Sequence, residues 1–164
     1  MKKFLVLIFS AVILFSFPLN VLAQEVNSFE LFWPISAGRT LGDSVYFLKS
    51  FKEILRGILI FGKPQKADYS IFLTVKRAVE TEKLITEGKN ELAVKTLGKM
   101  SKQLDIANES ISNSEGMAQE VTNRINTRLD NLEVFLAWLV TKSEPVKGDL
   151  QSLLEQVKGL NQKI

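Results

Sequence analysis

The stretch that decides the fold is residues 64–87, with the sequence PQKADYSIFLTVKRAVETEKLITE. Its apolar residues recur at spacings of three and four, which is the period of a helix that buries one face. The charged residues Lys76, Arg77 and Glu80 are expected on the opposite, solvated face. The sequence therefore predicts a long amphipathic helix whose buried stripe consists of Ile71, Phe72, Val75, Ala78, Val79, Leu84 and Ile85.

Four further segments show a helical pattern. The first begins near Asp43 or Ser44, either of which can accept a backbone N–H as an N-cap, and Gly62 ends it. The others cover about 90–112, 117–141 and 145–160. No segment alternates with the period of a strand. Short connections favour antiparallel neighbours, so we expect an all-α protein, a single helical bundle of about four to five antiparallel helices.

The first 23 residues have the composition of a signal peptide. Lys2 and Lys3 precede an apolar run over residues 4–17, and Pro18 and the small residue Ala23 follow. A retained membrane anchor is the alternative, but a spanning helix needs about 20 apolar residues. We therefore expect cleavage after Ala23 and a secreted or extracytoplasmic protein. The predicted organisation is a signal peptide at 1–23, an irregular entry segment at 24–42 and a helical domain at 43–164.

Charge and composition exclude several classes of function. The formal charge of +3 falls to +1 when Lys2 and Lys3 leave with the leader. The remaining charges are mixed in sign, whereas a nucleic-acid-binding protein shows a basic stripe. The chain has no histidine and no cysteine, which removes thiol catalysis, histidine acid–base catalysis and metal sites built from these ligands. We expect no nucleic-acid partner.

Catalytic and cofactor motifs are also missing from the sequence. It has no Gly-x-Ser-x-Gly elbow, no calcium loop and no glycine-rich phosphate loop. The carboxylate pairs Glu80–Glu82 and Asp130–Glu133 match glycoside hydrolysis only by residue type, and we expect both to be exposed. We therefore predict that the protein is not an enzyme and has no catalytic residue, cofactor or metal site.

The segment 51–63, FKEILRGILIFGK, is the one stretch with a positive functional signal. A helix that is apolar on all sides is normally interior, so the interpretation we favour is a central helix that its neighbours bury. The alternative is a helix that lies at a membrane surface with Lys52, Arg56 and Lys63 around its apolar residues. The aromatic residues of the entry segment are expected to dock on the helical body, or else to be exposed for a partner. The candidate contact surface consists of Phe32, Trp33, Ile58, Ile60 and Phe61.

Three blocks of the chain together resemble a bacterial family of exported, all-helical domains of unknown function. Residues 37–49, AGRTLGDSVYFLK, are similar to its GDS-x-Y-x-LK opening. Residues 66–84, KADYSIFLTVKRAVETEKL, are similar to its second-helix pattern, and residues 129–145 resemble its closing part. The resemblance covers about residues 34–160. It implies a helical, exported protein and no particular activity, ligand or catalytic residue.

These observations lead to two functional hypotheses. We expect a non-catalytic, exported helical interaction or structural module of the bacterial cell envelope, which contacts a protein partner. The alternative is a peripheral membrane or lipid-contacting helical protein that uses residues 51–63. The sequence leaves the oligomeric state open.

Overall fold

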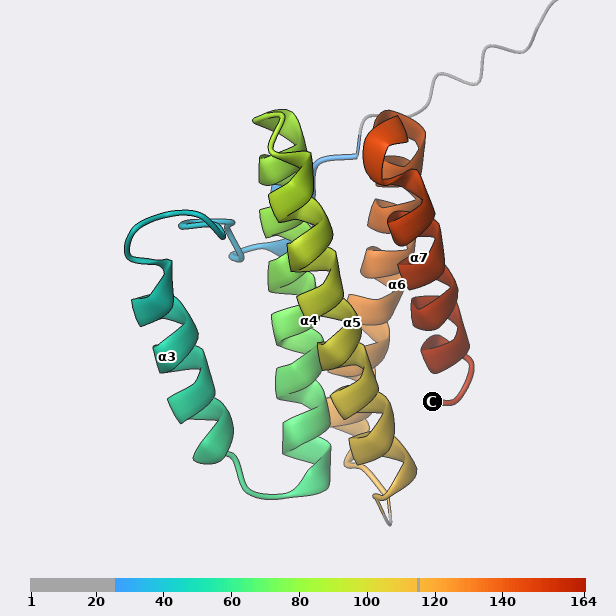
Figure 1. The fold of residues 1–164 in the computed structure, drawn as a ribbon. Coiled ribbons are helices and arrows are strands. Elements are labelled where there is room, and N and C mark those ends of the chain that lie inside the picture. The colour runs from blue at the N-terminus through green and yellow to red at the C-terminus, as the bar shows by residue number, and fades with distance from the viewer. Residues whose placement is uncertain (1–25, 115) are drawn as a thin grey trace, which may run out of the picture.

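Figure 1 shows the fold as a computed structural model, which describes residues 26–114 and 116–164. The predicted signal peptide lies outside the described residues. The described chain contains helices and no strand, which confirms the all-α prediction. The helices are α2 (Ser28–Phe32), α3 (Tyr46–Ile58), α4 (Lys63–Thr86), α5 (Asn90–Ser112), α6 (Gln119–Lys142) and α7 (Lys147–Asn161), with a short 3₁₀ turn at Glu144–Val146.

The helices α4, α5, α6 and α7 form an up-down-up-down bundle (Figure 1). Helix α4 packs against α5 and α6, and α7 packs against α6 and α5. Turns of a few residues join neighbouring helices, which is the connection that antiparallel neighbours require. The core between them is apolar and fully buried, with Ile71, Leu84, Leu97, Met100, Ile125, Leu129, Leu132, Phe135, Leu136, Leu139 and Leu150 as its largest members.

The entry segment contains the short helix α2, where the sequence predicts irregular structure. The side chain of Asn27 caps it by accepting a hydrogen bond from the backbone N–H of Phe29 at 3.0 Å. Phe32 then packs edge-on against Phe135 of α6, with 5.3 Å between the ring centroids. The aromatic side chain therefore docks on the helical body, as expected.

Helix α3 stands at the side of the bundle next to α4 (Figure 1). It begins at Tyr46, not at the predicted Asp43 or Ser44. The reason is that the Asp43 carboxylate accepts a hydrogen bond from the backbone N–H of Thr40 at 2.7 Å, so it stabilises the preceding turn instead of the helix. Within the described residues, no helix is both long enough and apolar enough to cross a membrane.

Candidate functional site

Helix α3 turns its polar stripe towards the bundle. Tyr46, Lys49 and Glu53 follow one another at helical spacing, so they share one face. Tyr46 is buried, and Lys49 and Glu53 are mostly buried. Gly57 continues this face, and a β-carbon added at this position would lie 3.5 Å from the ring of Tyr69 in α4. The side of α3 that meets the protein is therefore polar, which is the reverse of an ordinary amphipathic helix.

Ion pairs hold this polar stripe against α4. The Lys49 ammonium pairs with the carboxylate of Glu80 and donates to the backbone carbonyls of Ala37 at 3.0 Å and Arg39 at 2.6 Å. Glu53 pairs with Arg77 and lies 2.7 Å from the Lys76 ammonium. These contacts connect α3 both to α4 and to the loop that precedes α3.

Glu80 is the centre of the network and is fully buried. Arg77 Nη1 donates to Glu80 Oε1 at 2.6 Å, and both side chains lie on one face of α4. The expectation that Arg77 and Glu80 are solvated was therefore wrong. Their positions satisfy the helical period, but a second helix covers them, and periodicity within α4 does not reveal that cover.

Burial and the neighbouring carboxylates shift the pKa values of Lys49 and Arg77 in opposite directions. Burial lowers the pKa of Lys49, although the bond to Glu80 opposes it. Burial also disfavours the Arg77 cation, but the nearby carboxylates of Glu80 and Glu53 outweigh it and raise the pKa of Arg77. A buried guanidinium that stays charged is an anchor for two carboxylates. The network is thus structural, and it places α3 on the bundle.

An aromatic layer completes the contact between α3 and the bundle. The Tyr46 ring lies under three cationic groups, with distances to its centroid of 4.7 Å for Lys99 Nζ, 5.7 Å for Lys49 Nζ and 5.8 Å for the Arg77 guanidinium carbon. Burial raises the pKa of the Tyr46 hydroxyl. The Tyr69 hydroxyl donates to the backbone carbonyl of Glu53 at 3.0 Å. These contacts orient α3 about its own axis.

The consequence is that the apolar face of α3 points to solvent. With 3.6 residues per turn, the apolar residues from Phe47 to Leu59 cover an arc of about 140° around the helix axis. This exposed face therefore overturns the interpretation of this segment as a central, buried helix. The exposed residues, which we call the outer face of α3, are Phe47, Leu48, Phe51, Ile54, Leu55, Ile58, Leu59 and Phe61.

The five predicted contact residues lie in different places. Ile58 and Phe61 belong to the outer face, with 66% and 83% of their surfaces exposed. Ile60 is half-buried and lines the groove described next. Trp33 is 68% exposed and belongs to the entry segment, not to α3. It packs beside Phe29, with 4.6 Å between the ring centroids. Phe32 is only 4% exposed, so it is a core residue and not part of a surface.

A groove of about 530 Å³ runs between α3 and the bundle helices α4 and α5. Ile54 and Ile58 line it from α3, and Leu73 and Ile106 line it from the bundle. Lys66 and Lys99 add positive charge. The groove borders the outer face, so apolar and basic groups lie next to each other on this side of the molecule.

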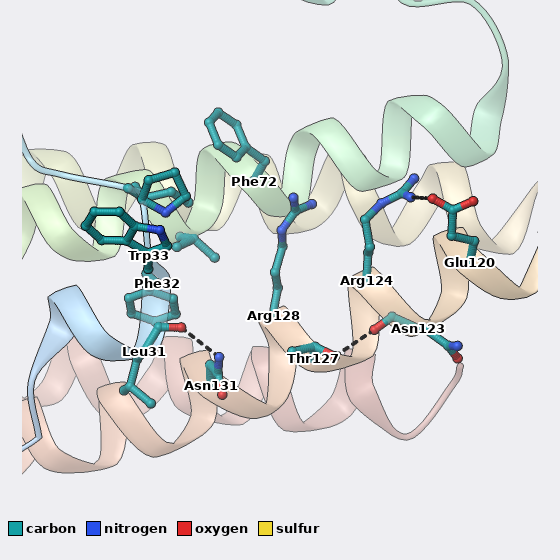
Figure 2. A pocket seen from close by; sticks show the side chains of 13 residues that line it. Leu31, Phe32, Trp33, Phe72, Glu120, Asn123, Arg124, Thr127, Arg128 and Asn131 are labelled. Atoms are coloured by element: carbon teal, nitrogen blue, oxygen red, sulfur yellow. Dashed lines mark hydrogen bonds and ion pairs between the residues drawn. The ribbon is translucent and has the colours of Figure 1, made fainter.

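A second pocket of about 440 Å³ lies between the entry segment, α4 and α6. Figure 2 shows Trp33 at one end and the long side chains of Arg124 and Arg128 projecting from α6. Both arginines form ion pairs with Asp68, and Arg124 also pairs with Glu120. Because its cations already have carboxylate partners, this pocket is a weaker candidate than the region around α3.

No group of three or more acidic side chains is arranged to hold a metal ion in the described part of the chain. Of the four carboxylates considered from the sequence, Glu80 is held in the buried network. Glu82 is half-buried, and desolvation raises its pKa, although a hydrogen bond with Ser28 opposes this shift. Asp130 accepts a hydrogen bond from Asn161 at 2.9 Å. These contacts account for three of them as structural groups.

The residues that carry the family resemblance meet at the α3–α4 contact. Tyr46 and Lys49 come from the first block, and Arg77 and Glu80 come from the second. The order of these blocks in the sequence was the available signal for the network. It did not indicate that the blocks touch, because the ion pairs between α3 and α4 join residues 23 to 31 positions apart.

Comparisons with known proteins add one finding. No curated protein and no solved structure matches the chain. The sequence model of one family, described as Domain of unknown function (DUF5667), matches residues 38–134. The match includes α3, α4, α5 and the first two thirds of α6, and therefore the whole ion-pair network. Because it covers more than half of the 164 residues, the chain belongs to the DUF5667 family.

Proposed function

We propose that this protein is a non-catalytic, exported module of the bacterial cell envelope, and that it works by contact through the outer face of α3. The observation that carries this proposal is the orientation of α3. Eight large apolar side chains lie in solvent along one helix and the turn after it. Soluble monomers rarely expose a contiguous apolar patch of this kind unless it binds something.

The fold itself cannot cover this face. The inward side of α3 is taken by Tyr46, Lys49 and Glu53, whose partners in α4 are buried. A rotation of α3 that buried the apolar side chains would separate Lys49 from Glu80 and Glu53 from Arg77. Loss of a partner costs several kcal/mol for a buried ion. Within residues 26–114 and 116–164, the exposed face is thus the stable arrangement, and no described element covers it.

The proposal of export rests on the composition of residues 1–23. The absence of histidine and cysteine from the sequence, and the structural use of Glu80, support a role without catalysis. Contact is then the function that uses the exposed outer face of α3.

The test is site-specific crosslinking in cells that produce the full chain. A photoreactive residue replaces Phe51 on the outer face, and a matched variant carries it at Val134, which is 53% exposed on α6. We expect envelope components to crosslink to position 51 and not to position 134.

A companion measurement is retention of the protein by the cell envelope. Phe51→Ser combined with Ile58→Ser should release the protein into the soluble fraction, while Val94→Ser combined with Val134→Ser should not. Equal crosslinking at positions 51 and 134, or equal retention of both double variants, would contradict the proposal. Mass spectrometry of the isolated protein tests export at the same time, because cleavage leaves Gln24 as the first residue.

A further inference from the structure

We infer that the body that covers the outer face of α3 is an anionic lipid surface, on which α3 lies parallel to the membrane plane. This inference rests on the proposed function, since it names the partner of the same face. Three observations lead to it: the charge around the face, the way α3 is held, and the shape of the face.

The charges around α3 are nearly all positive. Residues 44–66 contain five basic side chains and one acidic side chain, Glu53, which is a balance of +4. Since residues 24–164 together carry +1, the remainder of that chain carries −3. Glu53 is turned inward against Arg77 and Lys76, so it does not offset the basic groups at the surface.

Four of the basic side chains are exposed and form no ion pair with any described residue: Lys52, Arg56, Lys63 and Lys66. On the helix, Lys52 lies at the edge of the apolar arc, next to Leu48 and Leu59. Arg56 lies one turn further on, with its guanidinium carbon 5.4 Å from the centroid of the Tyr69 ring in α4. Long basic side chains at the edge of an apolar face can extend to lipid phosphates while their methylene groups stay in the apolar layer. Each basic residue near an anionic surface contributes about 1 kcal/mol to binding.

The support of α3 fits a helix that lies on a membrane. An interfacial helix needs an apolar face towards the acyl chains and a polar face on the other side. In this protein the polar face is held by the bundle, through Glu53, Lys49 and the ring of Tyr46. The helix is therefore presented to a surface in a folded state, and it does not have to fold upon binding.

A second copy of the chain fits the same face less well. Two outer faces in contact would bring the basic edge of one copy close to that of the other, and opposed like charges disfavour association. A planar surface with negative phosphates complements the basic edge and the apolar arc together. Self-association and a protein partner are therefore outcomes that the experiment must separate from lipid binding.

The experiment is vesicle co-sedimentation with the purified chain, prepared with and without residues 1–23. One set of vesicles contains equal parts of phosphatidylglycerol and phosphatidylcholine, and the other contains phosphatidylcholine alone. We expect binding to the anionic vesicles and at least about tenfold weaker partitioning into the neutral ones, because several basic groups lose their phosphates.

Two pairs of variants locate the binding. Phe51→Ser with Ile58→Ser should abolish sedimentation, whereas Val94→Ser with Val134→Ser should leave it unchanged. Lys52→Gln with Arg56→Gln should lower partitioning by roughly tenfold or more, whereas Lys95→Gln with Lys142→Gln should have little effect. Circular dichroism checks that each variant keeps the helical fold of the parent protein.

Absence of sedimentation with anionic vesicles, equal binding to neutral vesicles, or full binding by the Phe51→Ser, Ile58→Ser variant would overturn the inference. Envelope retention in cells that depends on the outer face, together with no vesicle binding, would keep the proposed contact function and assign the face to a protein. Sedimentation velocity of the protein without lipid tests the third possibility, because a dimer that used this face would be detected there.

Discussion

At the scale of single residues, Arg77 is the residue on which the ion-pair network between α3 and α4 depends most. It lies between the carboxylates of Glu53 and Glu80, and all three side chains are largely buried. Removal of one partner from a buried ion pair leaves a charge that neither water nor protein solvates. The contribution of such a network to the free energy of unfolding is therefore measured mainly by the removal of one member.

We predict that Arg77→Met lowers the free energy of unfolding by about 3–5 kcal/mol. The matched variant is Arg124→Met, which should cost at most about 1 kcal/mol. Its partner Glu120 is 85% exposed, and its other partner, Asp68, keeps an ion pair with Arg128. Urea unfolding followed by circular dichroism measures both values. Similar costs for the two variants would show that the Arg77 network is solvated in solution.

Glu82 leads to a prediction about pH. Burial raises its pKa above the ordinary value, so the folded state binds its proton more tightly than the unfolded state does. The contribution of Glu82 to the free energy of unfolding is therefore fully present at pH values below its pKa in the unfolded state. It is lost as the pH rises through its pKa in the folded state. Glu82→Gln removes that loss because it carries no charge at any pH.

We expect Glu82→Gln to raise the free energy of unfolding by a few tenths of a kcal/mol at about pH 7. The gain should disappear near about pH 3.5, where the wild-type carboxyl is protonated as well. Urea titrations at the two pH values measure the difference. Destabilisation at about pH 7 that becomes smaller near about pH 3.5 would mean that the hydrogen bond with Ser28, which favours the charged carboxylate, outweighs burial at this position.

At the scale of elements, α3 is a helix attached by ions to a bundle that has its own core. Apart from Phe32, Tyr46 and Val146, the buried apolar residues of the described chain lie on α4, α5, α6 and α7. Helix α3 contributes Tyr46 alone to that set. Elements that bury few apolar groups open more readily than the core does.

This arrangement predicts that α3 opens as a separate unit. Glu53→Gln weakens the link to Arg77 and Lys76, and amide hydrogen exchange over residues 46–58 should become faster by about tenfold or more, as expected for a lost bond to a charged group. Exchange in α4 and α6 should stay as in the parent protein. Glu155→Gln, on the exposed side of α7, is the control. Faster exchange in all helices would show instead that α3 and the bundle unfold together.

The positions of α4, α5, α6 and α7 could be predicted from the sequence almost completely, whereas α2 was missed and α3 ends at Ile58, before the predicted end at Gly62. The pattern at 64–87 corresponds to Lys63–Thr86 in the structure, and the pattern at 117–141 corresponds to Gln119–Lys142. Apolar period, glycine at the ends and proline after a glycine act within a few residues, so one sequence is sufficient to locate them.

The side of α3 that faces the bundle could not be predicted in the same way. Both Phe47 and Tyr46 are large aromatic residues near its start, yet one is exposed and the other is buried. The choice depends on Glu80, which lies 31 positions from Lys49 and attracts the polar stripe. Local periodicity identifies a polar and an apolar face but does not reveal a buried carboxylate on another helix.

At the scale of the whole molecule, the described chain is a four-helix bundle with α3 at its side. The bundle supplies stability from its apolar core, and α3 supplies the surface with an unusual composition. The residues that form the core are therefore different from those that form the outer face of α3. Changes to the outer face are thus expected to alter contact before they alter stability.

The polar seam between α3 and the bundle also determines what happens when α3 moves away. Opening most amphipathic contacts exposes hydrocarbon to water, which is the main cost of opening them. Here water would enter between Glu53, Lys49 and their partners and would hydrate them, so the wetted surface is ionic. Gly42 and Gly62 lie on either side of α3, both with positive φ, which side chains other than glycine rarely adopt. Helix α3 thus lies between two turns that favour glycine, with an inner side that tolerates water and an outer side that avoids it.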